Sequence, residues 1–321
     1  MALSGVFLDA LVECRVSLVI IRKNAPTAPW QQAFASQAPD LVVHAWPETG
    51  PLEEVDYVLC WAPGAGEIAR YPNLKAVFSL GAGVDHLLSD DTIPLHLPIV
   101  RMVDKSITDG MVQYVVMAVL NHHRRMDEMR ANQAEKIWRR LDLSNPQIGI
   151  MGMGGLGKAS ARALAAMGYR VRGWNRSGRP VEGLDVFGGA GGLKSFLAET
   201  DILISLLPHT EETIGILNRE TFAALRQGAY VINAGRGEQL VEEDLLRALR
   251  SGQICGAMLD VFCKEPLAAD HPFWGEERVT VTPHIASWVD PAAGTAHVLR
   301  AIEAIKHCEI PEGQVDRTAG Y

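Results

Sequence analysis

Residues 147–157 read Gln147-Ile148-Gly149-Ile150-Met151-Gly152-Met153-Gly154-Gly155-Leu156-Gly157 and give the strongest indication of the fold. This stretch begins as an apolar strand and leads into a helix-prone segment at residues 159–167. The first glycine of such a loop permits a tight turn, the second lets the backbone approach a pyrophosphate, and the third lets helix and strand pack closely. The stretch therefore predicts a dinucleotide-binding loop made of Gly152, Met153, Gly154, Gly155, Leu156 and Gly157.

The same glycines almost form a different phosphate loop, that of the nucleoside triphosphatases. Gly152, Gly157 and Lys158 have its spacing, but the next residue is Ala159, where that loop needs the magnesium-binding hydroxyl of Ser or Thr. Ser160 comes one position too late. Dinucleotide binding is therefore the better interpretation.

Short apolar runs on both sides of this loop alternate with helix-like segments, which predicts parallel sheets. Six strands of a full dinucleotide-binding domain are expected at residues 147–151, 169–174, 201–206, 230–233, 257–260 and 279–282. Five more strands, without a phosphate loop after the first, are expected at residues 16–21, 41–43, 57–60, 76–80 and 99–100.

The order of these blocks predicts an α/β fold of two doubly wound parallel-sheet domains. A Rossmann dinucleotide-binding domain at residues 113–288 is expected to be inserted into a flavodoxin-like substrate domain at residues 1–112 and 289–321. One long helix is expected from about residue 108 to residue 136, capped by Thr108 or Asp109. A last helix is expected at about residues 291–308, and the glycine run at residues 188–192 is interpreted as a loop.

Length and composition exclude several other classes of protein. The 321 residues exceed what one hydrophobic core usually supports, which indicates two domains. The net charge of −8 argues against nucleic acid as the main partner, because neutralising phosphates needs a basic face. We also expect no membrane partner and a cytoplasmic location, because no apolar run approaches the ~18 residues of a membrane span and the N-terminus lacks the basic start of a secretory signal.

Neither the cysteines nor the histidines are spaced like metal ligands. The five cysteines are scattered without a C-x-x-C pair, so we expect free and mostly buried thiols. No H-E-x-x-H or comparable spacing occurs, and we predict no bound metal.

The strand after the glycine loop should end in the residues that select the cofactor's ribose. The sequence there is Trp174-Asn175-Arg176-Ser177-Gly178-Arg179. A site selective for NAD would place Asp or Glu near position 175, whereas Asn175 is neutral and Arg176 can grip a 2′-phosphate. These residues predict a preference for NADPH, with NADH also possible.

Three polar residues in the second half of the chain each follow an apolar strand. Arg236 comes directly after Asn233-Ala234-Gly235, Glu265 follows the strand that ends near Asp260, and His284 follows the last strand. Ligands bind at the carboxyl ends of such strands. A guanidinium can hold a carboxylate and polarise a carbonyl, and a histidine can protonate the alkoxide left by hydride attack. Glu265 would favour the imidazolium form of His284. Together the three residues predict an active site for hydride and proton transfer.

At this point the chain resembles a known family, the D-isomer-specific 2-hydroxyacid dehydrogenases. The resemblance covers nearly the whole chain, and within the family it extends to the glyoxylate/hydroxypyruvate reductase A branch. It rests on the glycine loop, Trp174-Asn175-Arg176-Ser177, Leu206-Leu207-Pro208, Asn233-Ala234-Gly235-Arg236-Gly237, Gly256-Ala257-Met258-Leu259-Asp260-Val261-Phe262, Glu265-Pro266-Leu267, Thr282-Pro283-His284-Ile285-Ala286 and Gly313-Gln314-Val315-Asp316-Arg317.

The resemblance implies a role for each of these pieces. It implies that Arg236 binds the substrate carboxylate, that His284 donates the proton and that Glu265 is its partner. Further substrate contacts are implied for Trp61, for the backbone of Ala82 and Gly83, and for Trp138 reaching a partner subunit. Cofactor contacts are implied for Leu207, Pro208 and Thr213 on the adenosine side and for Asp260 at the nicotinamide carboxamide. Asn233, Ala234 and Gly235 are also implied to contact the cofactor.

The function implied is NADPH-dependent reduction of glyoxylate and hydroxypyruvate to glycolate and D-glycerate by a cytoplasmic homodimer. One alternative is a reductase for bulkier 2-keto acids such as phenylpyruvate. Another is a nucleotide-sensing protein similar to a corepressor, which would bind a partner protein and turn over little substrate.

Overall fold

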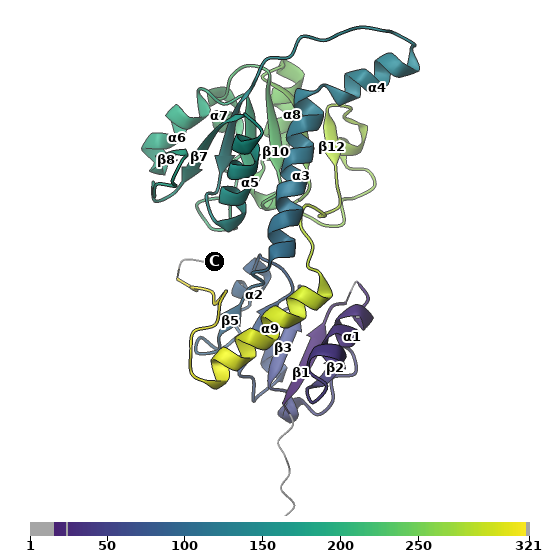
Figure 1. Cartoon of the computed structure of the whole chain (residues 1–321), viewed down its shortest axis with the longest axis vertical. Coiled ribbons are helices and arrows are strands. Elements are labelled where there is room, and N and C mark those ends of the chain that lie inside the picture. Colours follow the sequence, from purple (N-terminus) through teal and green to yellow (C-terminus); the bar gives the residue numbers. More distant parts are fainter. Residues whose placement is uncertain (1–15, 24, 319–321) are drawn as a thin grey trace, which may run out of the picture. The chain divides into compact units, whose positions relative to one another are not determined.

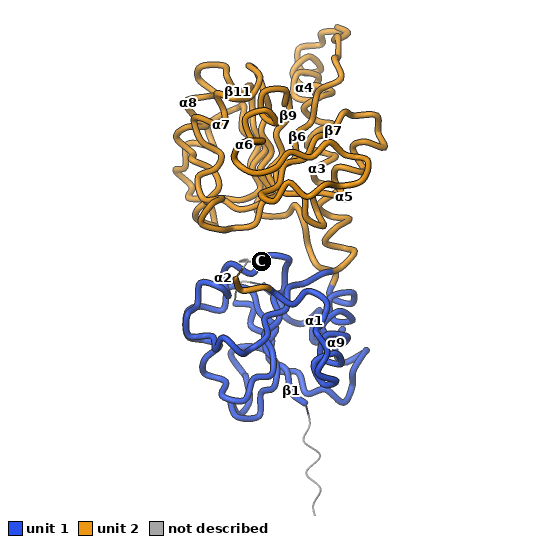
Figure 2. Tube along the Cα trace, turned by 90° about the vertical axis from the view of Figure 1, so that its left-hand side faces the viewer, with its two compact units in different colours: residues 1–103, 291–315 blue, residues 104–290, 316–321 orange. Residues whose placement is uncertain are grey.

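The chain forms two compact units in the computed structural model, which describes residues 16–23 and 25–318. One unit consists of residues 1–103 and 291–315, and the other of residues 104–290 and 316–321 (Figure 2). The sequence placed the two boundaries at residues 112/113 and 288/289. The expectations for the N-terminal segment, including Cys14, lie outside the described residues.

The first unit is built on a parallel sheet of five strands in the order β2-β1-β3-β4-β5, the order of a flavodoxin-like fold. The strands are β1 (Ser17–Ile21), β2 (Val42–Ala45), β3 (Tyr57–Cys60), β4 (Ala76–Ser79) and β5 (Ile99–Val100). Its helices are α1 (Ala28–Gln37), α2 (Asp85–Leu88) and α9 (Pro291–Lys306), with short 3₁₀ turns at Leu52–Glu54 and Ile68–Arg70. Helices α1 and α9 pack against each other (Figure 1).

The second unit is built on a parallel sheet of seven strands in the order β12-β11-β10-β9-β6-β7-β8. The strands are β6 (Gln147–Met151), β7 (Arg170–Asn175), β8 (Asp185–Gly188), β9 (Ile202–Ser205), β10 (Ala229–Asn233), β11 (Ile254–Leu259) and β12 (Val279–Val281). Its helices are α3 (Lys105–His123), α4 (Met126–Ala134), α5 (Gly155–Ala166), α6 (Gly189–Leu197), α7 (Arg219–Ala224) and α8 (Glu242–Ser251), with 3₁₀ turns at Gly237–Gln239 and Pro272–Gly275.

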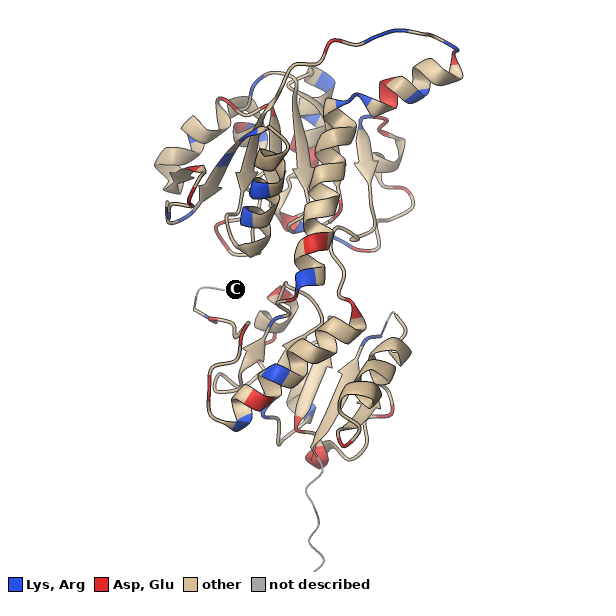
Figure 3. Ribbon diagram, in the orientation of Figure 1, with Lys and Arg blue, Asp and Glu red and all other residues tan. Residues whose placement is uncertain are grey.

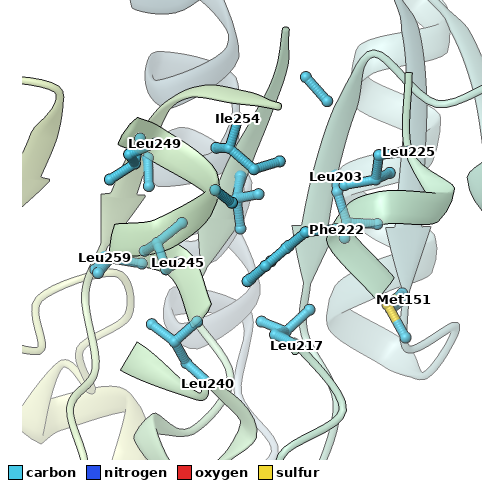
Figure 4. Close-up of a cluster of buried hydrophobic side chains, with 14 of the residues drawn as sticks. Met151, Leu203, Leu217, Phe222, Leu225, Leu240, Leu245, Leu249, Ile254 and Leu259 are labelled. Atoms are coloured by element: carbon cyan, nitrogen blue, oxygen red, sulfur yellow. The ribbon is translucent and has the colours of Figure 1, made fainter. Parts of the chain in front are cut away.

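Both faces of this second sheet are covered, because alternate residues of its strands belong to two different buried clusters. On β9, Leu203 belongs to one cluster, whereas Ile202 and Ile204 belong to the other. Successive side chains of a strand point to opposite faces, so helices are needed on both sides. Helices α7 and α8 supply Phe222 and Leu245 to the first cluster (Figure 4), and α3 and α5 pack together over the second (Figure 1).

Four local expectations were wrong. Strand β8 was missed because it is an edge strand of only 4 residues, and the glycine run that follows it starts α6 instead of a loop. The long helix is two helices, α3 and α4, separated at Arg125, whose φ is +53°. Neither glycine nor proline marks that break. The cap of α3 is Asp104, whose carboxylate accepts a hydrogen bond from the Ser106 backbone N–H at 2.6 Å.

The surface of the described residues carries charges of both signs, and acidic and basic positions are interspersed on each unit (Figure 3). Of the four cysteines described there, only Cys60 is buried, so the expectation of mostly buried thiols was wrong. Cys255, Cys263 and Cys308 are exposed because they lie in loops or on an outward strand position. No helix in the described part of the chain is both long and apolar enough to cross a membrane.

Candidate active site

The glycine loop joins β6 to α5, and its backbone is shaped for close approach. Gly152 has a φ of +99°, and a Cβ there would lie 2.5 Å from the carbonyl oxygen of Leu206. A Cβ on Gly157 would overlap the carbonyl oxygen of Gly152. At Gly154 and Gly155, by contrast, an added Cβ would meet no atom of the described residues within 4 Å. The loop therefore leaves open space at the N-terminus of α5, where backbone N–H groups can hold a pyrophosphate.

Beside this loop, the residues after β7 form a tight turn stabilised by Asn175. Its Oδ1 accepts hydrogen bonds from the Arg179 N–H and the Ser177 hydroxyl, both at 3.2 Å, and its Nδ2 donates to the Arg179 carbonyl at 3.1 Å. The Trp174 indole N–H donates to the Gly189 carbonyl at 3.0 Å. The turn presents the Arg176 guanidinium, which forms an ion pair with Glu212 at 3.3 Å.

The loop after β9 carries Leu207, Pro208 and Thr213, the residues expected on the adenosine side. The Thr213 hydroxyl donates to the Pro208 carbonyl at 2.7 Å and accepts from the Thr210 N–H at 2.9 Å. Buried Gln239 adds hydrogen bonds from its Nε2 to the carbonyls of Leu207 at 2.8 Å and Pro208 at 3.2 Å. Sequence reasoning missed Gln239, which ties this loop to the one that carries Arg236.

Arg236 follows β10 on a loop that Asn233 shapes. The Asn233 Oδ1 accepts from the Gly235 N–H at 3.2 Å, and its Nδ2 donates to the Arg236 carbonyl at 3.0 Å. The half-buried Arg236 guanidinium donates to the Gly235 carbonyl at 2.8 Å. The loop thus fixes a cation at the carboxyl edge of the sheet, where it can meet a substrate carboxylate.

Glu265 and His284 form the pair that the sequence predicted as proton donor and partner. The two atoms Nδ1 of His284 and Oε2 of Glu265 lie 2.8 Å apart, and the other carboxylate oxygen accepts from the Phe262 N–H at 3.0 Å. Partial burial raises the pKa of Glu265, but the hydrogen bond and charge of His284, the Phe262 N–H and the charge of Arg236 outweigh it and hold the pKa below its ordinary value. Glu265 is therefore an anion at neutral pH and lies within electrostatic reach of Arg236.

The backbone around His284 is held by Asp260, which is fully buried. The Asp260 carboxylate accepts from the Ile285 N–H at 2.9 Å, the Ala286 N–H at 2.7 Å and the Thr282 hydroxyl at 2.6 Å. The Thr282 hydroxyl also lies 2.7 Å from the Tyr114 hydroxyl of α3. Three bonds to flanking residues keep His284 at its φ of +54°, which a non-glycine residue adopts only under constraint.

Asp260 was expected beside the nicotinamide, and that contact stays a prediction. Its observed bonds give it a second task, the positioning of the His284 loop. Sequence reasoning missed the contributions of Tyr114 and Thr282, because Tyr114 is 168 residues away from Thr282 and no spacing rule joins them.

Gly237 lets the Arg236 loop and the Glu265 loop approach each other. A Cβ at this position would overlap the backbone of Phe262 and Cys263. We expect Gly237→Ala to push these loops apart and to lower kcat/KM by about 10²-fold, since a displacement near 1 Å at a catalytic group has an effect of that size. Steady-state kinetics, with thermal unfolding measured alongside, would check this.

The matched control is Gly275→Ala, because a Cβ at Gly275 would meet no atom of the described residues within 4 Å. This variant should keep full turnover. Equal activity of the two variants would mean that the contact between the loops does not position the catalytic groups.

The expected substrate residues of the first unit lie after β3 and β4. The Trp61 and His86 rings pack with centroids 4.7 Å apart, and a Cβ on Gly81 would lie 2.6 Å from the Trp61 ring. The Ser79 hydroxyl donates to the Gly83 carbonyl at 2.8 Å and accepts from the Gly81 N–H at 3.2 Å, which shapes the turn that contains Ala82. Trp61, Ala82 and Gly83 remain predicted substrate contacts.

Trp138 follows α4, and its side chain is 100% exposed, which is exceptional for a tryptophan. Its contact with a partner subunit remains a prediction. Among the described residues, no group of three or more His, Cys, Asp or Glu side chains could hold a metal ion.

The second unit thus combines a dinucleotide loop with a cation and a hydrogen-bonded histidine–carboxylate pair on loops at the carboxyl edge of one sheet. This combination defines a nucleotide-dependent oxidoreductase. The family model of the D-isomer specific 2-hydroxyacid dehydrogenase NAD-binding domain matches residues 116–286. The chain belongs to the D-isomer specific 2-hydroxyacid dehydrogenases.

Relatives and solved structures agree with this family. The chain is 41% identical over 300 residues to glyoxylate/hydroxypyruvate reductase A of Yersinia enterocolitica. This match covers 91% of this chain and 96% of the relative. A family member of Xanthobacter autotrophicus Py2 in complex with NADPH and MES superposes with a TM-score of 0.91 at 37% identity, over 96% of this chain and 100% of that one. The NADPH-dependent glyoxylate/hydroxypyruvate reductase of Sinorhizobium meliloti, in complex with NADP and sulfate, superposes with a TM-score of 0.90 at 39% identity. This match covers 95% of this chain and 100% of that one.

Proposed function

We propose that the protein uses NADPH to reduce glyoxylate and hydroxypyruvate to glycolate and D-glycerate. This proposal rests on the hydrogen bond between His284 and Glu265, which is 2.8 Å long. Arg236 lies on another loop at the same edge of the sheet, and its charge helps to lower the pKa of Glu265. A 2-keto acid needs one cation for its carboxylate and one proton donor for its carbonyl oxygen. The relatives in Yersinia enterocolitica and Serratia proteamaculans are named glyoxylate/hydroxypyruvate reductase A, which supports these two acids as substrates.

The proposed chemistry assigns one task to each side chain. Bound NADPH would supply a hydride to the carbonyl carbon. Arg236 holds the substrate carboxylate and stabilises the negative charge that develops on the oxygen. Glu265 binds Nδ1 of His284, which leaves Nε2 to deliver the proton to that oxygen. The keto acid gains one hydride and one proton in total and becomes the hydroxy acid.

The preference for NADPH follows from the residues beside the ribose position. Asn175 uses its side chain to fold its own turn, and no carboxylate stands in its place. Arg176 offers a planar guanidinium for a 2′-phosphate. The structures from Xanthobacter and Sinorhizobium were obtained with NADPH and NADP, which supports this preference.

We also propose that the enzyme is a cytoplasmic homodimer and that Trp138 contacts the substrate of the partner subunit. The complete exposure of Trp138 supports this, together with the exposed Ile137 and Leu143 close to it in the sequence and the exposed Met117 on α3. A contiguous group of exposed apolar side chains is typical of a surface that another subunit covers.

The experiment that tests the function is the loss of NADPH absorbance with glyoxylate, hydroxypyruvate, pyruvate and phenylpyruvate, repeated with NADH. We expect fast oxidation of NADPH with the first two acids and slower oxidation of NADH. A preference for phenylpyruvate would favour the bulkier substrate class. Tight NADPH binding without turnover of any acid would contradict the proposal and favour a sensor.

A further inference from the structure

The Arg176–Glu212 ion pair spans the glycine loop from one side to the other. In the sheet, β6 lies between β7 and β9. Arg176 follows directly after β7, Glu212 lies in the loop after β9, and the glycine loop follows β6. The ion pair, 3.3 Å long, therefore joins the two loops that flank the dinucleotide loop.

Both partners stand on turns held by hydrogen bonds, and both side chains extend into solvent. Asn175 folds the turn that carries Arg176, and hydrogen bonds from the N–H groups of Thr213 and Ile214 to the Thr210 carbonyl fix the turn that carries Glu212. The side chains themselves are 56% and 64% exposed. The ion pair can therefore open by side-chain rotation without any change in the loops.

Glu212 carries its charge throughout the neutral range. A hydrogen bond from the Thr210 side chain, a backbone N–H and the charge of Arg176 lower its pKa below the ordinary value. The carboxylate is thus an anion at neutral pH, and it lies beside the guanidinium that a 2′-phosphate would need.

We propose that Glu212 is a specificity-determining residue that competes with the 2′-phosphate of the cofactor for the Arg176 guanidinium. This inference rests on the proposed cofactor site. A dinucleotide with a 2′-phosphate must displace the Glu212 carboxylate or tolerate its charge, whereas a dinucleotide without that phosphate leaves the ion pair intact. Glu212 therefore weakens the binding of NADPH but not of NADH, and it reduces the difference in affinity between the two cofactors. Specificity is then set in part by a repulsive contact.

The test is the dissociation constant of the apoenzyme for NADPH, NADH, 2′,5′-ADP and 5′-ADP, measured by titration calorimetry. We expect Glu212→Gln to tighten NADPH and 2′,5′-ADP about two- to five-fold, the range that an exposed ion pair is worth, and to leave NADH and 5′-ADP unchanged. The gain should be larger at about 20 mM salt than at about 200 mM, because salt screens exposed charges.

The matched control is Glu211→Gln, which removes the same charge one residue away and leaves the Arg176–Glu212 pair in place. It should change the four constants far less. Weaker NADPH binding by Glu212→Gln would mean that Glu212 positions Arg176 and would overturn the proposal. An equal change for NADPH and NADH, or an equal effect of the two variants, would also overturn it.

A second pair of variants separates this inference from the proposed function. In an Arg176→Gln background, Glu212→Gln should no longer tighten NADPH. If Arg176→Gln alone left NADPH binding unchanged, both the cofactor preference and this inference would fail. If the enzyme reduced no keto acid while Glu212→Gln still tightened only the 2′-phosphorylated ligands, the proposed substrates would fail and the inference would stand.

Discussion

Replacing His284 by alanine is expected to lower kcat by roughly 10²–10⁴-fold, the usual contribution of a positioned general acid. Nδ1 of His284 lies 2.8 Å from Oε2 of Glu265, a contact that orients the ring, and Nε2 is the nitrogen to which we assign the proton transfer. Without the imidazole, water must protonate the alkoxide. The dissociation constant for NADPH should stay unchanged, because the glycine loop lies on a different strand end. Steady-state kinetics and nucleotide titration together would check both statements.

A suitable control is His307→Ala, because His307 lies on the exposed surface just after α9 in the other unit. This variant should retain wild-type turnover. Near-normal kcat in the His284→Ala variant would contradict the assignment of His284 as proton donor.

The second large effect is expected at Arg236. Arg236→Ala should lower kcat/KM by about 10²–10³-fold, because it removes both the carboxylate contact and a cation near the developing negative charge. Arg236→Lys should recover only part of the loss, since an ammonium cannot form the two parallel bonds of a guanidinium. The kinetic constants for glyoxylate and hydroxypyruvate, measured at saturating NADPH, would check this.

The control for charge alone is Arg247→Ala on the exposed face of α8, where Arg247 pairs with Glu243 at 2.8 Å. It should leave kcat/KM unchanged. If Arg236→Ala raised KM while kcat stayed constant, Arg236 would contribute to ground-state binding alone and its role in stabilising the transition state would be refuted.

The sequence predicted the family, the α/β fold and the two parallel sheets, since strong local patterns carry that information. The glycine loop, for example, needs glycines where a Cβ would strike the backbone, as at Gly152 and Gly157. Strand β8 was not predicted, because an edge strand of 4 residues gives only a weak apolar pattern. The break between α3 and α4 was not predicted, because it lies at Arg125. Arginine is a good helix former, but here it adopts a left-handed conformation.

The candidate site shows a similar division. Arg236, Glu265 and His284 could be found because each follows an apolar strand, and the structure brings Glu265 and His284 into hydrogen-bonding contact. The residues that position them could not be predicted from the sequence, because they act across long sequence separations. Asp260 binds the N–H groups beside His284, Tyr114 contacts Thr282, and Gln239 joins two loops.

The most direct test of the central claim is the fate of the hydride. The enzyme would be incubated with hydroxypyruvate and NADPH that carries deuterium at both positions of nicotinamide carbon 4, and the glycerate formed would be examined by mass spectrometry and NMR. We expect one deuterium on carbon 2 of glycerate, with the hydroxyl proton drawn from solvent through His284. Glycerate without deuterium, or no glycerate while NADPH remains bound, would contradict it.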